Sequence, residues 1–144
     1  MDGISEILAT YNCVSLDEKI QFELDGVVEK EIKQAYCIEN LEFCVSCMDY
    51  TTLKVSDTEE SVKNFTADLL KKLKKFNLRD VAAVCVFSNY AGIVREGLKG
   101  TEIQTAVVAV NFPNSQTFTE KKLAECKMEI GAGAQEDDVV ISGG

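Results

Sequence analysis

Three consecutive acidic residues, Glu136, Asp137 and Asp138, lie in a segment whose β-branched end, residues 139–141, is typical of a short buried strand. An ionised carboxylate that is removed from water costs several kcal/mol unless it is paired, hydrogen-bonded or neutralised. Acidic side chains in such a strand are therefore candidates for a functional site. Because side chains alternate across a strand, Glu136 and Asp138 share one face while Asp137 lies on the other. One face would border a pocket, and the other would pack against helices.

The sequence has six cysteines and no histidine. Without histidine no Ser-His-Asp or Cys-His pair can form, and a zinc site would have to use thiolates or carboxylates. Cys44 and Cys47 have the CxxC spacing, but they lie in a run predicted as a strand, where positions three apart point to opposite faces. Buried cysteine behaves as a small hydrophobe, so we favour packing over a metal or redox role for this pair.

The chain has 144 residues, the size of one domain, with 46% hydrophobic and 27% charged residues. No apolar run approaches the length of a membrane span. The net charge of −9 argues against nucleic acid and against an anionic membrane surface as partners, since both attract basic patches. The first residues lack the basic and apolar regions of a signal peptide, so a cytoplasmic location is expected.

Residues 1–41 are predicted to form a helical, polar and acidic N-terminal extension. Residues 43–48 then predict a strand that leads into Asp49. Asp57 is predicted to cap a helix, because Glu60 follows three residues later as in a capping box. The apolar stripe of this helix contains Val62, Phe65, Leu69, Leu70, Leu73 and Phe76.

Two nearly continuous apolar runs, residues 81–87 and 103–110, predict strands buried on both faces of a parallel sheet. Ser88 is expected to cap a short helix after the first run, and residues 117–120 have the spacing of a capping box for the last helix. The apolar face of the last helix is predicted to contain Phe118, Leu123, Cys126 and Ile130. With a strand at 136–141, the element order favours parallel strands joined by right-handed helical crossovers.

Four such strands fit either a small doubly wound sheet or half of an eight-stranded barrel, and periodicity does not separate the two. In both folds the ligand site lies at the carboxyl ends of the strands. The segments expected to converge are residues 49–52, 85–89, 111–115 and 138–142. No glycine-rich phosphate motif follows a strand, so nucleotide binding has no support.

Four segments together resemble deoxyribose-phosphate aldolase in order and spacing, over about residues 43–144. They are Met48-Asp49-Tyr50-Thr51-Thr52-Leu53 with Asp57-Thr58-Glu59-Glu60-Ser61, Ala82-Ala83-Val84-Cys85-Val86-Phe87, Phe112-Pro113 with Thr117, and Gly133-Ala134-Gln135-Glu136-Asp137-Asp138-Val139-Val140-Ile141. The resemblance implies an α/β fold: the amino-terminal half of a TIM (β/α)8 barrel over residues 42–144, with about four parallel strands and crossover helices. The helical extension at 1–41 would precede it.

The resemblance also implies an activity, the reversible retro-aldol cleavage of 2-deoxyribose 5-phosphate to acetaldehyde and glyceraldehyde 3-phosphate in deoxyribonucleotide catabolism. The family is a class I aldolase that uses a lysine Schiff base and needs no metal or cofactor. The protonated Schiff base takes up the electron pair that is left when the carbon–carbon bond breaks. A second lysine and an aspartate support proton transfer around it.

Four residues match the family by position. Asp138 corresponds to the catalytic aspartate, the last acid of a Glu-apolar-Asp motif on strand four. Asp49 and Thr51 correspond to substrate-binding residues of strand one, and Cys85 corresponds to the strand-two cysteine near the substrate.

Three departures from the family pattern stand out. The Schiff-base lysine and the second lysine belong to strands six and seven of the family, which this sequence does not contain. Asp137 replaces an apolar residue and would face the helix layer, where an unpaired carboxylate is costly. Ser88 stands where the family usually has proline.

These features leave three hypotheses open. The chain is either the amino-terminal half of an aldolase, inactive until a complementing C-terminal half supplies the lysines, or a catalytically inactive half-barrel that acts as a binding or scaffold protein. A half-barrel of either kind exposes strand edges, which favours a homo-oligomer or a complementing partner. The third hypothesis is an unrelated flavodoxin-like domain in which Asp138 is a satisfied edge acid.

Overall fold

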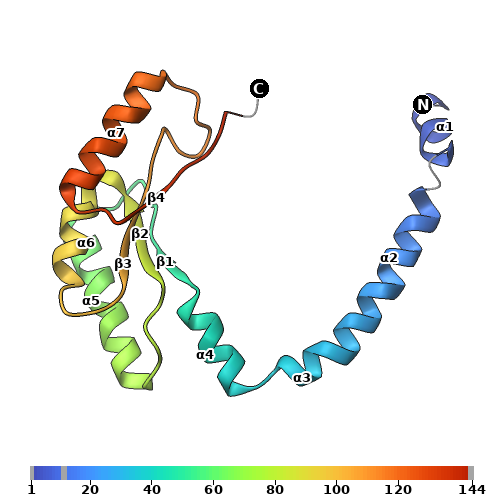
Figure 1. Cartoon of the computed structure of the whole chain (residues 1–144), viewed down its shortest axis with the longest axis horizontal. Helices are drawn as coiled ribbons and strands as arrows, with labels where there is room; N and C mark the ends of the chain where they lie inside the picture. The colour runs from blue at the N-terminus through green and yellow to red at the C-terminus, as the bar shows by residue number, and fades with distance from the viewer. Residues whose placement is uncertain (1, 11–12, 143–144) are drawn as a thin grey trace. The chain divides into compact units, whose positions relative to one another are not determined.

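The computed structural model of the chain describes residues 2–10 and 13–142. It contains two compact units, Met1–Leu41 and Glu42–Gly144 (Figure 1). No helix among the described residues is long and apolar enough to cross a membrane.

The described elements of the first unit are helices: α1 (Asp2–Thr10), α2 (Cys13–Val27), the π-helical turn η1 (Val28–Ile32) and α3 (Lys33–Ala35). Apolar side chains along them, including Phe22, Val27 and Ile32, are exposed. The apolar side chains whose burial the structure describes in these helices are therefore not packed into a core.

The predicted strand at 43–48 is wrong, because most of it belongs to helix α4 (Ile38–Ser46). The partly buried residues of this segment, Glu42, Val45 and Ser46, recur at helical spacing, and Val45 packs against the main core. A short apolar run does not distinguish a strand from a helix, and here packing decided for the helix. Cys44 and Cys47 are exposed as a result.

Four parallel strands form one sheet in the order β1 (Asp49–Thr51), β2 (Ala83–Phe87), β3 (Gln104–Val108) and β4 (Glu136–Asp138). Each strand pairs with its neighbour along the chain. A doubly wound sheet would reverse its order at one point, so this order fits an arc of a barrel. The fold class is therefore α/β with four parallel strands and crossover helices, as predicted.

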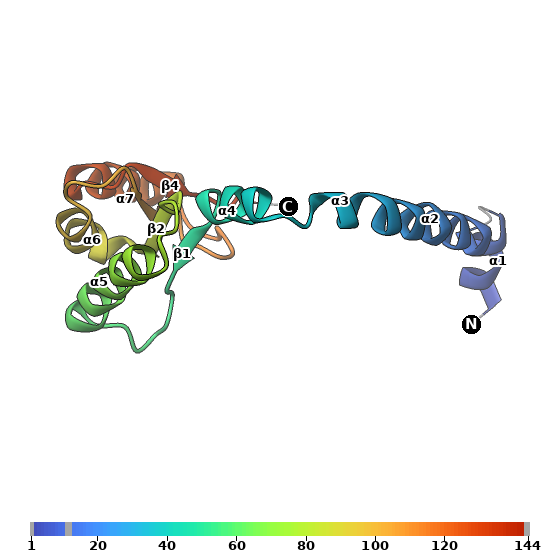
Figure 2. The same ribbon diagram turned by 90° about the horizontal axis from the view of Figure 1, so that it is seen from below.

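Three crossover segments cover one face of the sheet: α5 (Glu59–Phe76), the 3-10 turn η2 (Ser88–Tyr90) with α6 (Ala91–Gly97), and α7 (Thr119–Ala132) (Figures 1 and 2). The main core lies between these helices and the sheet and includes Val62, Leu69, Leu98, Val84 and Val107. A smaller cluster on the opposite face contains Ala83, Cys85, Ala106 and Val108, with Leu53, Phe87 and Phe112 packed against it.

Helix α5 is present as predicted, but its cap is Thr58 rather than Asp57. The Thr58 hydroxyl accepts a hydrogen bond from the Ser61 amide, and the Ser61 hydroxyl accepts one from the Thr58 amide, which is a complete capping box. Asp57 instead accepts hydrogen bonds from the Thr52 hydroxyl and the Lys54 amide at 2.9 Å each. Its carboxylate therefore orders the loop that follows β1.

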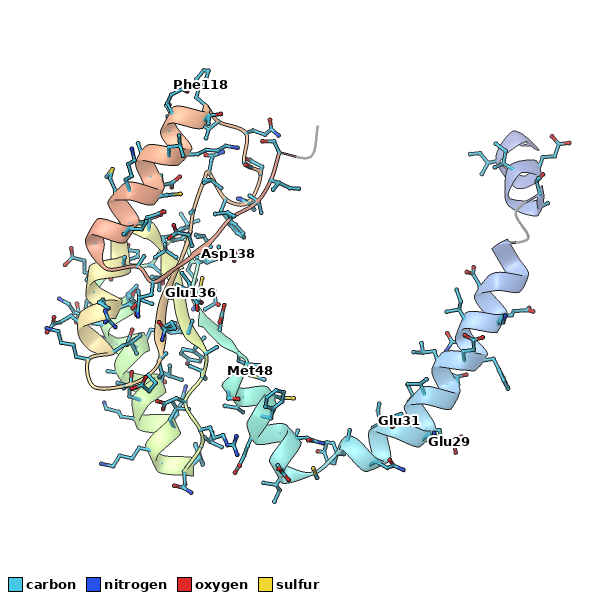
Figure 3. All side chains as sticks on the ribbon, in the orientation of Figure 1. Glu29, Glu31, Met48, Phe118, Glu136 and Asp138 are labelled. Atoms are coloured by element: carbon cyan, nitrogen blue, oxygen red, sulfur yellow. The ribbon has the colours of Figure 1, made fainter. Side chains whose placement is uncertain are left out.

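The two other predicted caps are also wrong. Ser88 does not cap a helix, since its hydroxyl donates to the carbonyl of Val108 at 3.0 Å and ties η2 to β3. Helix α7 begins after Phe118 without a side-chain cap. Phe118, at the tip of α7 in Figure 3, is 73% exposed, and Leu123 and Ile130 are exposed as well. The predicted apolar face of α7 thus does not face the core.

Strand β4 is shorter than the predicted strand at 136–141. It ends at Asp138, and Val139 and Ile141 are exposed. Glu136 and Asp138 are exposed too, since β4 is the last strand of the sheet. The acids of this face therefore remain in contact with water, and the expectation that they are buried is wrong.

Candidate functional site

The four residues that the sequence singled out, Asp49, Thr51, Cys85 and Asp138, lie on one face of the sheet. Thr51 is in register with Cys85, and Asp49 with Ala83. Asp138 is in register with Val108, which belongs to the same cluster as Cys85. Because residues in register on parallel strands point to the same side, this face is opposite the one covered by the helices.

Cys85 lies at the centre of this group and is only 3% exposed. Burial raises the pKa of its thiol to about 11, and the charges of Asp138 and Asp49 act in the same direction, while a hydrogen bond with Thr51 opposes them. The thiol is therefore protonated at neutral pH. A protonated, buried thiol is neither a nucleophile nor a good metal ligand, so Cys85 serves as an apolar part of the site floor.

None of the four strands contains a lysine. The described chain nevertheless places one amine at the carboxyl ends of β3 and β4. Lys122 of α7 donates hydrogen bonds to the hydroxyls of Ser115, at 2.6 Å, and Ser142, at 3.2 Å. Sequence reasoning did not single out Lys122, because it lies on a helix rather than at a strand end. The only sequence signal was its place in the first turn of the last helix, beside one of the segments expected to converge.

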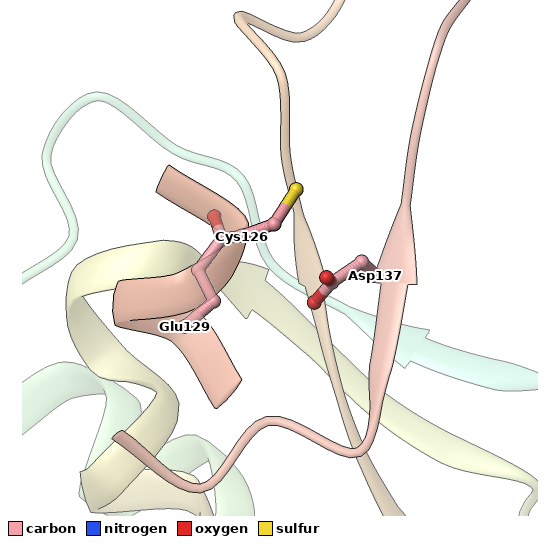
Figure 4. A group of neighbouring side chains, drawn as sticks. All are labelled: Cys126, Glu129 and Asp137. Carbon is pink, nitrogen blue, oxygen red and sulfur yellow. The ribbon is translucent and has the colours of Figure 1, made fainter. Parts of the chain in front are cut away.

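The opposite face contains a second group, formed by Cys126 and Glu129 of α7 and Asp137 of β4 (Figure 4). One ligand atom of each residue lies within 4.8 Å of the other two. Asp137 faces the helix layer, as alternation along β4 predicts. Glu129 was missed by the sequence analysis. The sequence signal that could have identified it is its spacing of three residues from Cys126, which places both side chains on one face of a helix.

Glu129 is 2% exposed, and neither carboxylate oxygen has a hydrogen-bond partner. Burial raises the pKa of Glu129, and the charges of Asp137 and Glu125 add to this effect, while the nearby Ser88 hydroxyl opposes it. The pKa of the Cys126 thiol is raised as well, first by burial and then by Asp137 and Glu129. The charge of Asp137 thus disfavours the charged forms of both Glu129 and Cys126.

An open cavity of about 580 Å³ lies between α7 and the segments that follow β2 and β3. Ser88, Asn89 and Asn111 line it on one side, and Glu125, Met128 and Glu129 line it from α7. It belongs to the helix side of the sheet and not to the face with Asp138. Glu129 is among the residues that line this cavity, although both of its carboxylate oxygens are buried from solvent.

Comparison with known proteins finds relatives for most of the chain, although no family model matches the sequence. The deoxyribose-phosphate aldolase of Clostridium novyi is 41% identical over 97 residues, which are 67% of this chain and 40% of that protein. The Bos taurus and Homo sapiens proteins of the same name are 34% and 32% identical and cover 85% and 99% of this chain. The chain spans only 41% and 46% of their lengths.

Solved structures agree with these relatives. A Coccidioides immitis protein proposed to be a deoxyribose-phosphate aldolase superimposes with a TM-score of 0.59 at 26% identity, over 69% of this chain and 36% of that one. The tetrameric deoxyribose-phosphate aldolase of Aeropyrum pernix gives a TM-score of 0.54 at 26% identity, over 68% and 38% of the two chains. Sequence and fold thus relate this chain to the deoxyribose-phosphate aldolases, of which it spans less than half.

Proposed function

We propose that this chain supplies the first four strands of a deoxyribose-phosphate aldolase, which cleaves 2-deoxyribose 5-phosphate reversibly to acetaldehyde and glyceraldehyde 3-phosphate. The observation that carries the proposal is the common sheet face of Asp49, Thr51, Cys85 and Asp138. These residues match the family's site by position, and the register of three strand pairs supports their convergence. A cytoplasmic location, which the sequence analysis expects, also belongs to the proposal.

Each side chain has a distinct role in this proposal. Asp138 is exposed on the edge strand, where its carboxylate can accept and return a proton at the substrate. Asp49 and Thr51 provide a carboxylate and a hydroxyl for the hydroxyl groups of the sugar. Cys85 stays neutral and excludes water from the floor of the site.

The four strands contain no lysine, and the Lys122 amine is hydrogen-bonded to Ser115 and Ser142, so in this proposal the Schiff-base amine comes from a complementing segment. Strands β1 and β4 are the two edges of the sheet, so their outer backbone groups can pair with further strands. We propose that a C-terminal half carrying the lysines, as the rest of a longer chain or as a separate partner, docks at these edges. The chain alone would then be inactive.

The alternative is a catalytically inactive half-barrel that binds a partner or serves as a scaffold. The observation that favours it is the pair of acids Asp137 and Glu129 in the helix layer, where the aldolase pattern has an apolar residue at position 137. A second copy of the chain could close such a half-barrel.

Complementation separates the two proposals. The chain is mixed with the remaining carboxyl-terminal strands of the Clostridium novyi relative, and release of acetaldehyde from 2-deoxyribose 5-phosphate is measured. We expect activity in the mixture and a loss of at least about 100-fold in Asp138→Asn, the usual scale of a lost proton-transfer group. Glu102→Gln removes an exposed acid before β3 and should leave activity unchanged. A folded chain that docks with these strands but stays inactive would support the scaffold instead.

A further inference from the structure

We propose that Cys126, Glu129 and Asp137 bind a divalent cation of the zinc class, with one thiolate and two carboxylates as ligands. Cys126 and Glu129 lie three residues apart in α7, and Asp137 faces them from β4 (Figure 4). The ligand atoms of the three side chains lie within 4.8 Å of one another. The site joins the last crossover helix to the edge strand.

The burial of Glu129 is the independent observation that points to a ligand. Its side chain is 2% exposed, it faces Cys126 and Asp137, and both of its oxygens lack a hydrogen-bond partner. Among the described residues, no ion pair involves Glu129 or Asp137. Buried charges in proteins are paired or coordinate metals, and here no lysine or arginine provides the pairing.

The donor set selects the class of cation. Ca²⁺ and Mg²⁺ prefer sites built of oxygen alone, whereas a thiolate favours Zn²⁺ and similar borderline-soft ions. In a tetrahedral zinc site the ligand atoms are separated by roughly 3.4–3.6 Å, as follows from the usual Zn–S and Zn–O bond lengths. The ligand atoms of the three side chains now lie within 4.8 Å of one another, so binding an ion would draw them closer together. Water would complete the four ligands.

The charges of the three side chains also fit a bound cation. Three ionised ligands would carry three negative charges in one cluster, and a divalent ion would reduce this to one. The open cavity beside α7 is lined by Glu129 and therefore borders one of the three proposed ligands. Without an ion, burial beside other acids favours the protonated form of Glu129, which is the competing explanation.

This site is separate from the proposed aldolase site and does not depend on it. Asp137 and Asp138 point to opposite sides of β4, so an ion at Asp137 does not approach the face with Cys85. We therefore assign the ion a structural role. It would hold α7 against a strand of only three residues at the edge of the sheet.

Cobalt provides the direct test. The whole 144-residue chain is stripped with EDTA and titrated with Co²⁺, and the thiolate-to-cobalt charge-transfer absorption is recorded. We expect one cobalt per chain, displaced by Zn²⁺, and loss of the absorption in Cys126→Ser. Glu129→Gln and Asp137→Asn should weaken binding at least about tenfold, since even the loss of a residue that only supports a metal ligand costs about that much. Circular dichroism verifies that each variant is folded.

Two matched controls address the other thiols and acids. The double variant Cys44→Ser with Cys47→Ser removes exposed thiols of the CxxC pair and should bind cobalt as the wild type does. Glu136→Gln removes the acid next to Asp137 on the other face of β4 and should also leave binding unchanged. Binding that survives Cys126→Ser but disappears in the double variant would overturn the proposal.

Thermal unfolding gives a second readout. Zn²⁺ should raise the melting temperature of the wild type, and this rise should be absent in Glu129→Gln. A metal-free Glu129→Gln that melts no lower than the metal-free wild type shows that the variant is folded. If neither cobalt absorption nor a zinc-dependent rise is observed with the wild type, the protonated Glu129 accounts for the cluster and the metal site is refuted.

Discussion

Asp137 and Asp138 are consecutive residues of β4, yet their carboxylates lie on opposite faces of the sheet. Asp137 is in register with Val107 of the core under the helices, and Asp138 with Val108 of the cluster that contains Cys85. The two carboxylates thus have different neighbours, although they belong to consecutive residues of one strand. Substitutions at one of them should leave the surroundings of the other unchanged.

The first prediction concerns Glu129 in metal-free protein. Glu129→Gln should raise the free energy of unfolding at neutral pH by about 1 kcal/mol or more, because its amide cannot ionise and an unsatisfied charged group costs more to bury than a neutral one. Burial raises the pKa of Glu129 above its usual 4.5, so the folded state binds more protons than the unfolded state. The wild type therefore loses stability as the pH rises through that usual value and on toward the raised pKa.

Urea unfolding in EDTA, at a pH below 4.5 and at neutral pH, measures this difference. The advantage of Glu129→Gln should be absent at the lower pH, where Glu129 is protonated in both states. Glu136→Gln, at an exposed position, should change stability little at either pH. A Glu129→Gln variant that is less stable than the wild type at neutral pH, with the metal chelated, would contradict this account.

The second prediction concerns the reactivity of Cys85. With a thiol pKa of about 11, only about one thousandth of Cys85 is thiolate at a pH three units lower. Iodoacetamide should therefore modify exposed Cys44 and Cys47 long before Cys85, as mass spectrometry of peptides can follow. Asp138→Asn should shift the alkylation profile of Cys85 to lower pH, because it removes one of the charges that raise its pKa. Equal rates for Cys85 and Cys44 in folded protein would refute this.

The third prediction compares two leucines. Leu98 is fully buried in the core next to α6, and Leu98→Ala should lower the free energy of unfolding by about 2–5 kcal/mol through lost burial and a cavity. Leu123 is 58% exposed on α7, and Leu123→Ala should change stability by no more than about 0.5 kcal/mol. Urea denaturation of both variants measures the two changes in the free energy of unfolding and tests whether the side of α7 that contains Leu123 is exposed. A large loss of stability in Leu123→Ala would contradict this arrangement and support the apolar face of α7 predicted from the sequence.

The sequence predicts the central elements of the sheet because their signals are strong. The runs at 81–87 and 103–110 are nearly all apolar and contain β2 and β3, and the stripe from Val62 to Leu73 defines α5. Alternation along 136–138 also predicts that Asp137 and Asp138 face opposite sides. In these cases a local pattern and the final packing agree.

Shorter segments depend on packing that no local pattern contains. Residues 43–48 have strand-forming side chains, but residues 43–46 belong to α4, where Val45 contacts the core. In α7 the helix turns Glu129 inward and leaves Leu123 and Phe118 exposed, which hydrophobicity alone would not predict. The sequence pattern therefore did not predict the buried position of Glu129 or its cluster with Cys126 and Asp137.

Borohydride trapping tests the central claim, that this chain forms part of a Schiff-base aldolase. The chain is incubated with 2-deoxyribose 5-phosphate and borohydride, alone and with the carboxyl-terminal strands of the Clostridium novyi relative, and adducts are located by mass spectrometry. The account predicts no adduct on this chain in either sample and one adduct on a lysine of the added strands. An adduct on a lysine of this chain, or no adduct in an assembled mixture, would contradict it.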